Sequence, residues 1–258
     1  MASSDSKASN PINGITHLVK GLQMLMLPGL RRYLLAPIGI NIVVFVVIGW
    51  IGYSQFEGLL NTFLPESSWL SFLRWLLWPL FALSILLITF YTFTTVANLI
   101  AAPFNSQLSA KVEEMLTGKK PPENRQSITQ LILPTVRSEL RKLVYFLLRA
   151  IPLLILFIIP GINLLAPFLW LLFSAWFLAI EYGDYPMGNH GLEFKEQHDR
   201  LKQTRLAALT FGGGVTLLMM VPILNFAAMP AAVIGATRLW CDKGSVDRAE
   251  VPTPRASV

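Results

Sequence analysis

The sequence predicts an all-α integral membrane protein: two long transmembrane helices, two proline-broken helical hairpins of half-membrane depth, and amphipathic helices on the cytoplasmic side. Three observations predict this class. Only 14% of the 258 residues are charged, against about a quarter in an ordinary soluble domain. Apolar residues gather into long uncharged blocks, giving a mean hydropathy of +0.54. Prolines interrupt the last two of these blocks.

The N-terminal third is expected to hold a tail, an interfacial helix and the first span. Residues 1–10 are Ser-rich and polar, which predicts a disordered tail. Over 11–27 the apolar residues recur with the 3.6-residue period of an amphipathic helix, expected to lie on the membrane surface. Pro28-Gly29 should end that helix. The first span is expected over 30–56, because the block from Tyr33 to Phe56 is uncharged and about 20 apolar residues cross the hydrocarbon core.

The second span is expected over 75–117, with its end extending into the cytoplasm. The uncharged block from Trp75 to Gln107 is longer than a span needs, and Gly118 suits a helix C-cap. An amphipathic helix is expected over 127–149. Four Lys and Arg precede the first span, one lies between the spans and eight lie from Lys111 to Arg149. The positive-inside rule therefore puts both ends of the two-span unit in the cytoplasm.

Two further apolar stretches, 150–180 and 206–238, are expected to enter the membrane and return to the same face. Pro160-Gly161-Ile162-Asn163 with Pro167 divides the first, and Pro222-Ile223-Leu224-Asn225 with Pro230 divides the second. Each leaves apolar arms of about ten residues, too short to cross about 30 Å at 1.5 Å per residue. Basic residues flank both stretches, so the connecting segment 181–205 and the tail 239–258 are predicted to be cytoplasmic.

Four asparagines lie inside the apolar segments: Asn41, Asn98, Asn163 and Asn225. A buried amide in lipid needs a polar partner, so these residues should face the protein interior, where they could line an ion path. Asn163 and Asn225 also suit a structural role, bonding backbone groups freed by the neighbouring prolines. Non-helical hairpin tips at membrane depth must be enclosed. So few helices enclose a polar interior only as part of a homo-oligomer.

The most specific local feature is Pro28-Gly29-Leu30-Arg31-Arg32. A helix start offers unpaired amides and a partial positive charge, which together favour anions. Two guanidinium groups add forked donors that match a tetrahedral oxyanion. The sequence therefore predicts an oxyanion site at this turn. Arg31 and Arg32 equally suit anchors at the entrance of a span, and both roles can hold.

Other motifs carry less chemistry. Gly212-Gly213-Gly214 lacks the Lys-Ser/Thr of a phosphate loop and indicates close helix packing or a hinge. His17, His190 and His198 have no metal-ligand spacing and lie in expected surface segments. No nucleic-acid motif surrounds the basic residues, and no catalytic triad, carboxylate pair or nucleotide fingerprint occurs. We expect no enzyme, no metal and no cofactor.

Several motifs together resemble the CysZ family of bacterial sulfate permeases. They are the Pro28–Arg32 turn, Ala101-Ala102-Pro103-Phe104-Asn105, Ile159-Pro160-Gly161-Ile162, Phe173-Ser174-Ala175-Trp176, Asp184-Tyr185-Pro186 with Asn189-His190, and Pro222-Ile223-Leu224-Asn225. The resemblance covers about His17 to Trp240. It implies an inner-membrane homo-oligomer that supplies sulfate for cysteine biosynthesis, and it assigns sulfate contact to Gly29, Leu30, Arg31 and Arg32. The residues alone lead to an oxyanion; the choice of sulfate rests on the resemblance.

Two alternatives stay open on sequence. Movement should follow the gradient, as in a channel, yet Glu113, Glu114, Glu139 and Glu181 near the interface leave proton coupling open. The competing class is a non-transporting membrane scaffold whose amphipathic helices recruit a cytosolic partner.

Overall fold

A computed structural model describes residues 11–63, 71–122 and 128–247. All secondary structure in these three ranges is helical, without a strand. The chain forms two compact units, one of residues 32–104 and the other of residues 1–31 with 105–258. The expected tail at 1–10 and the end of the C-terminal tail lie outside the described residues.

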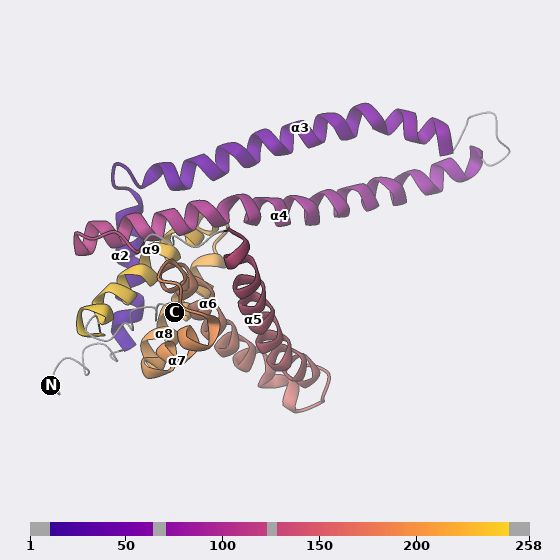
Figure 1. Ribbon diagram of the computed structural model, residues 1–258. Helices are drawn as coiled ribbons and strands as arrows, with labels where there is room; N and C mark the ends of the chain where they lie inside the picture. The colour runs from indigo at the N-terminus through magenta and orange to yellow at the C-terminus, as the bar shows by residue number, and fades with distance from the viewer. Residues whose placement is uncertain (1–10, 64–70, 123–127, 248–258) are drawn as a thin grey trace. The chain divides into compact units, whose positions relative to one another are not determined.

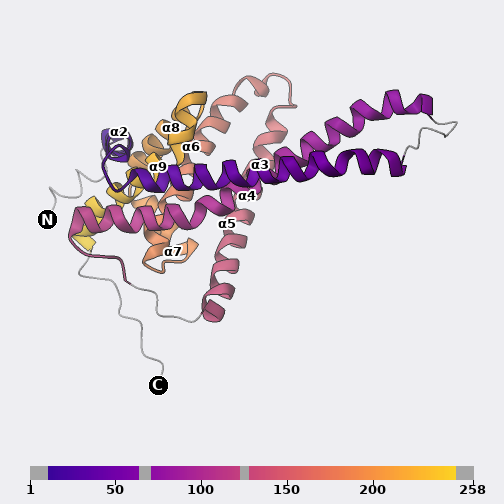
Figure 2. The ribbon, with the colours of Figure 1, turned by 90° about the horizontal axis from the view of Figure 1, so that it is seen from above.

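The 32–104 unit consists of α3 (Arg31–Phe63), without its first residue, and the first part of α4 (Ser71–Thr117). Both views show these helices running alongside each other (Figures 1 and 2). Apolar side chains such as Val43, Val46 and Trp50 are 61–71% exposed. Arg31–Ile48 is long and apolar enough to cross a membrane. Apolar side chains turned outward along a long helix are typical of lipid contact, not of a soluble core.

The other unit contains the end of α4 and six further α-helices among the described residues. They are α2 (Pro11–Leu25), α5 (Ile128–Leu156), α6 (Ala166–Asn189), α7 (Phe194–Gln203), α8 (Arg205–Met219) and α9 (Pro222–Asp247), with a short 3-10 helix, η1 (Ile162–Leu164), before α6. The core forms where α2 packs on α8 and α9, and where α6 packs on the same two helices.

Glycines allow this core to pack backbone against backbone. A Cβ added to Gly14 would overlap the carbonyl oxygen of Ala207, and one on Gly21 would overlap that of Ala231. A Cβ on Gly212 would overlap the carbonyl oxygen of Ala175 in α6. Gly212 therefore serves close helix packing, one of the two roles expected for the glycine run. In a lipid environment small residues of this kind are a principal means of bringing helices together.

The chain breaks near both proline motifs, in different ways. α5 ends at Leu156, Gly161 adopts a positive φ of 83°, and α6 begins at Ala166 with Pro167 in its first turn. α8 ends at Met219 and α9 begins at Pro222, whereas Pro230 lies inside α9 and is buried. Pro222 suits a helix start because its missing N–H is not needed there.

Three helices run further than the sequence boundaries suggested. α5 joins the expected amphipathic helix at 127–149 to the first arm of the hairpin, and α6 continues through Glu181 to Asn189. α9 continues to Asp247, so the segment expected as a tail from residue 239 is helical up to that residue. Leu239 and Cys241 are buried, so packing holds the end of α9 helical where composition alone indicated a tail.

The interfacial helix predicted at 11–27 is only partly a surface helix. Leu18 and Leu25 on one face are 4% and 0% exposed, while Ile12 and Ile15 on another are 67% and 50% exposed. α2 is therefore built into the helical core and presents a second apolar face outward.

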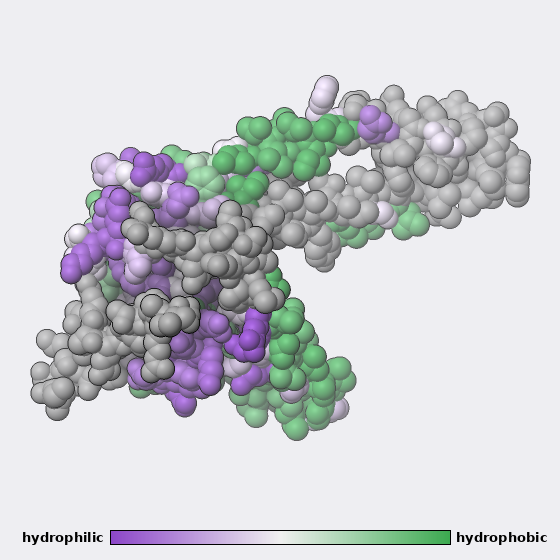
Figure 3. All heavy atoms as spheres, viewed as in Figure 1, coloured by the Kyte–Doolittle hydropathy of each residue, from purple (hydrophilic) through white to green (hydrophobic). Residues whose placement is uncertain are grey.

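The connection between α5 and α6 carries apolar side chains that the unit leaves uncovered. Ile158, Leu164 and Phe168 are 80%, 74% and 72% exposed. In Figure 3 the lower end of α5 and its hairpin is covered by hydrophobic atoms, whereas the region of α7 is hydrophilic. The helical unit thus has an apolar end and a charged end.

Candidate anion site and polar contacts

The turn before α3 is made from short backbone bonds and one glycine. Leu27 N–H donates to the Met24 carbonyl (2.9 Å) and Leu30 N–H donates to the Leu27 carbonyl (3.2 Å). Gly29 has φ 94°, a left-handed conformation that other residues adopt only with strain. Leu30 is 1% exposed and anchors the turn, which leaves Arg31 at the first position of α3.

The two arginines of the turn are exposed, and each makes a local contact. The boundary between the units falls between Arg31 and Arg32, and each guanidinium is held within its own unit. Arg31 Nε donates to the Met26 carbonyl at 2.7 Å. Arg32 Nη2 donates to the Tyr33 hydroxyl at 3.1 Å, with Arg32 Cζ 4.9 Å from the ring centroid. A guanidinium carries five N–H donors, so one such bond leaves donor capacity for an oxyanion.

The four candidate asparagines have different surroundings. Asn41 is half-buried, and its Oδ1 lies buried without a hydrogen-bond partner among the described residues. Asn163 and Asn225 are exposed. Their backbone N–H groups donate to Ile159 and Val221. The side chain of Asn98 lies outside what the structure describes. An unpaired buried amide oxygen as on Asn41 is costly and is expected where a polar group faces an interior or a path.

A line of polar contacts joins the end of α4 to α6 and α9. Ser109 Oγ lies 2.8 Å from Thr237 Oγ1, with both residues fully buried. Ser106 Oγ donates to Asn189 Oδ1 at 2.7 Å, and Asn105 Nδ2 donates to the Tyr185 hydroxyl at 3.4 Å. None of these residues had a role predicted from the sequence, although Asn105, Tyr185 and Asn189 belong to motifs that resemble the CysZ family. Polar residues on one face of an otherwise apolar helix were the available signal.

All three histidines were predicted to lie in surface segments. That prediction was wrong for His17, which is buried, whereas His190 and His198 are partly exposed. His17 is 4% exposed, with Nε2 3.1 Å from Asp242 Oδ2. Burial lowers the pKa of His17, against the opposing effect of Asp242. His190 Nε2 lies 2.7 Å from Glu113 Oε1, and the Glu113 side chain is 9% exposed. The period of α2 was recognised, but which of its faces meets α9 depends on residues far along the chain.

Lys142 is the buried cation of an ion-pair cluster between α5 and α6. Its Nζ lies 2.8 Å from Asp184 Oδ2, 3.2 Å from Glu139 Oε1 and 3.5 Å from Glu181 Oε2. Burial alone lowers the pKa of Lys142, but the Asp184 and Glu181 carboxylates and the Asp184 hydrogen bond together raise it. The lysine is therefore fully charged. Glu139 and Glu181, which the sequence offered as candidates for proton coupling, pair with this lysine.

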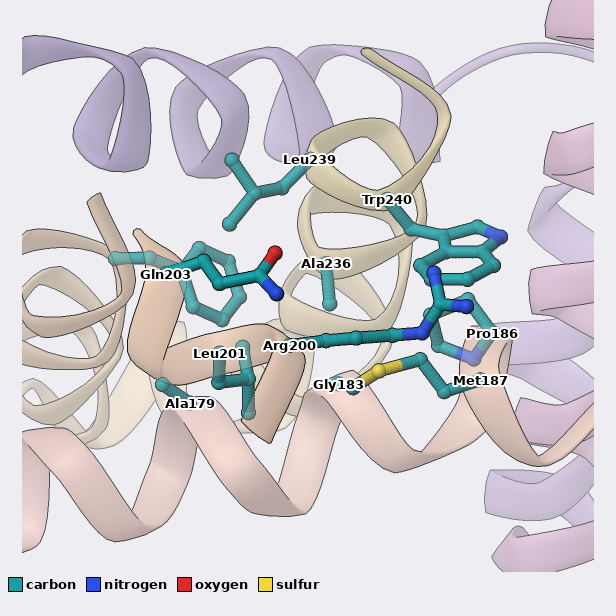
Figure 4. A pocket seen from close by; sticks show the side chains of 11 residues that line it. Ala179, Gly183, Pro186, Met187, Arg200, Leu201, Gln203, Ala236, Leu239 and Trp240 are labelled. Carbon is teal, nitrogen blue, oxygen red and sulfur yellow. The ribbon is translucent and has the colours of Figure 1, made fainter. Parts of the chain in front are cut away.

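A small cavity lies among α6, α7, α8 and α9 (Figure 4). Its volume is about 40 Å³, and its walls are mainly apolar, with Gly183, Phe211 and Leu239 among them. Arg200 lies with its guanidinium carbon 5.4 Å from the centroid of the Trp240 ring. With a single cation stacked on an aromatic ring, this cavity suits packing better than oxyanion binding.

Comparison with known proteins identifies the family. The family described as "Sulfate transporter CysZ/Etoposide-induced protein 2.4" matches residues 17–230. Proteins named "Sulfate transporter CysZ" are 43% identical over 232 residues in Pseudomonas aeruginosa LESB58, covering 89% of this chain and 94% of that protein. They are 45% identical over 239 residues in Pseudomonas fluorescens Pf-5, covering 92% and 96%. In Salmonella typhimurium LT2 the identity is 40% over 240 residues, covering 92% and 95%. The chain belongs to the sulfate transporter CysZ/etoposide-induced protein 2.4 family.

Proposed function

We propose that this protein is a sulfate transporter of the bacterial inner membrane, through which sulfate passes down its gradient to supply cysteine biosynthesis. The observation that carries the proposal is the similarity, at 40–45% identity over about nine-tenths of the chain, to proteins named sulfate transporters. Those names describe transporters, and we expect no catalytic activity and no cofactor in this chain.

The exposed apolar tip supports insertion of the α5–α6 hairpin into lipid. An apolar end as exposed as Ile158, Leu164 and Phe168 marks a contact with membrane or protein. α6 is long and apolar enough to be a candidate span over its full length, Ala166–Asn189. Its apolar part ends at Ile180, however, because Glu181 and Asp184 pair with Lys142. Fifteen residues rise about 22 Å, short of the about 30 Å core, so we infer a half-depth hairpin.

The second hairpin supports the same arrangement. α8 is an apolar helix of 15 residues, again about 22 Å long. Arg200 and Lys202 precede it, Arg205 is its first residue, and Arg238 lies in the second half of α9. Basic residues at both ends favour a hairpin that enters and leaves on the cytoplasmic face. The full spans are then α3 and α4.

The turn of Gly29, Leu30, Arg31 and Arg32 is the proposed sulfate site. Gly29 permits the turn, Leu30 fixes it in the core, and exposed guanidinium groups at the start of α3 supply forked donors. Charge-assisted bonds from arginine to a tetrahedral anion are about twice as strong as neutral ones. Sulfate keeps its charge at every physiological pH, so fixed positive charge suits its capture.

From this site sulfate would move along a polar route lined by Asn41, Asn98, Asn163 and Asn225. Asn163 and Asn225 lie beside the two hairpin breaks and are exposed, as residues facing a route completed by other copies would be. A homo-oligomer is therefore part of the proposal, since irregular backbone at membrane depth requires a protein or water-filled surrounding.

Uptake of labelled sulfate into proteoliposomes tests the site. Arg31→Ala combined with Arg32→Ala should lower initial uptake about 100-fold or more, because the two substitutions together remove at least two bonds to a charged group, each worth about 1.5–3 kcal/mol. The matched control is Arg137→Ala, an exposed arginine on α5, which should leave uptake within about twofold of wild type.

Gel filtration of all variants would show whether folding and assembly are kept. If the double variant took up sulfate at the wild-type rate, the proposed site would be wrong. Wild-type protein that binds sulfate in solution but never passes it would instead favour a scaffold that recruits a cytosolic partner.

A further inference from the structure

We propose that the groove between α5, α6 and α8 holds one acyl chain of a membrane lipid whose headgroup carries a primary amine, with the ammonium on Glu139 and Glu181. The proposal rests on the membrane placement proposed above, not on sulfate passage. It concerns residues that neither the anion site nor the polar route uses.

The apolar part of the groove is open and lined by aromatic and methionine side chains. Its volume, between α5, α6 and the end of α8, is about 340 Å³. Phe146, Trp170, Phe173 and Phe177 form one wall, with ring centroids of neighbouring pairs 4.7–6.2 Å apart. Met219 and Met220 line the other. Flexible thioethers facing fixed rings suit a mobile hydrocarbon chain.

A second hollow continues the groove toward the charged end of the unit. It has room for about 180 Å³ and is lined by Glu139, Lys142, Leu143, Phe146, Phe177 and Glu181. Phe146 and Phe177 line both hollows, so the two hollows adjoin, the first apolar and the second charged. We take them together as the groove. An amphipathic ligand matches this division.

The length of the groove matches one leaflet of a bilayer. Trp170 at the apolar end and Glu181 at the charged end lie eleven residues apart on α6, or about 16 Å along the helix axis. Half of the hydrocarbon core is about 15 Å. A chain lying in the groove would run from the interface to the middle of the membrane, the same depth as the hairpin.

The charge of the polar end selects the headgroup. Three carboxylates, of Glu139, Glu181 and Asp184, surround the single ammonium of Lys142, which leaves an excess of two negative charges. Asp184 is engaged by Lys142 and also accepts from Gln197 Nε2 at 2.6 Å. The Glu139 and Glu181 side chains are 56% and 42% exposed and carry the excess. They suit a lipid ammonium that donates hydrogen bonds, and they repel an anionic headgroup.

Native mass spectrometry of the purified full-length protein tests the proposal. The protein is mixed with equal amounts of phosphatidylethanolamine, phosphatidylcholine and phosphatidylglycerol of identical acyl chains, without sulfate. Phosphatidylethanolamine should be retained about three- to tenfold over the other two, because choline has no N–H and glycerol leaves a net negative headgroup. Equal retention of all three lipids, or preference for the anionic one, would overturn the proposal.

Two variants separate the headgroup contact from the chain contact. Glu139→Gln with Glu181→Gln should remove the preference while Asp184 keeps Lys142 paired; Glu114→Gln, on α4, should keep it. Ser174→Phe, which fills the groove, should lower retention of every lipid, whereas Leu172→Phe on the exposed face of α6 should not.

If Ser174→Phe instead dissociates the oligomer and leaves lipid retention unchanged, a second copy occupies the groove and the proposal fails. Because binding is scored without sulfate, loss of the lipid site and loss of sulfate uptake remain distinguishable.

Discussion

The two proline-broken hairpins of this protein look alike in sequence and differ in what covers them. In α8–α9, the residues Ala231, Val233, Ile234 and Thr237 are fully buried, and Gly212 admits the backbone of α6. In α5–α6, by contrast, Ile158 and its neighbours at the tip are largely exposed.

The contacts that hold each hairpin differ accordingly. α5 meets α6 through side chains: the ion pairs of Lys142 and the ring contact of Phe146 with Phe177 at 4.7 Å. The second hairpin meets its neighbours through glycine and alanine. Apolar area cannot distinguish a helix partner from lipid, so small residues decide which hairpin becomes the core. The first hairpin, rich in Leu, Ile and Phe, keeps the apolar side chains of its tip exposed.

The comparison would break at once if the hairpins crossed the membrane. Both are proposed to return to the face they enter, so exposed residues before the first and between the two should lie on one side. Cysteines replacing Lys119 and Lys202, both exposed, should react with an impermeant maleimide added to the same side of the membrane. Maleimide added to one side should therefore label both positions or neither. The native Cys241 is replaced by Ser in this experiment. Labelling of the two positions from opposite sides would mean that a stretch between them crosses.

If the second hairpin is held by close backbone packing, replacing Gly212 should destabilise the protein strongly, whereas replacing the next residue, Gly213, should not. Gly212→Ala should destabilise the protein by about 3 kcal/mol, because the new methyl group would overlap a backbone carbonyl that moves only with its helix. Gly213→Ala meets only the Ala175 methyl group, at 3.9 Å, and should be neutral or gain up to about 1 kcal/mol from helix propensity. Thermal unfolding in a mild detergent measures both. Equal effects would argue against backbone packing as the basis of this core.

The first hairpin should depend on charge instead. Lys142→Met leaves three carboxylates without their cation and should cost about 2 kcal/mol, less than the 3–5 kcal/mol of a fully buried pair because the acidic partners are partly exposed. The control is Lys202→Met, which removes an exposed pair with Asp199 and should cost under about 0.5 kcal/mol. The same unfolding measurement compares them, and similar losses would place α5 among elements held by apolar contact alone.

The same contrast explains how much of the fold could be predicted from the sequence. Hydropathy and proline predicted an all-helical membrane protein and the region of both breaks, because both signals are local. Packing against neighbouring helices decides whether Pro222 ends a helix or begins one. The same packing keeps Pro230 inside α9. Contacts such as Ser109 with Thr237, 128 residues apart, and the burial of His17 by α9 leave no periodic trace. The Arg31-Arg32 turn could be singled out as a candidate site because all its residues lie within five consecutive positions.

The smallest expected effect is the pH dependence caused by His17, which α2 places in the core beside α9. Burial lowers the pKa of His17 below its usual value of about 6.5, so below that pH the unfolded chain binds more protons at this residue than the folded one. Stability due to His17 is thus fully present above pH 6.5 and is lost as the pH falls. His17→Gln should reduce the loss of stability between pH 7.5 and pH 5.5 by up to about 1 kcal/mol. Unfolding at both pH values, compared between variant and wild type, cancels the carboxylates that they share. A larger pH dependence in the variant would mean that the pairing with Asp242 outweighs burial, and that α2 is held to α9 by charge, as α5 is to α6.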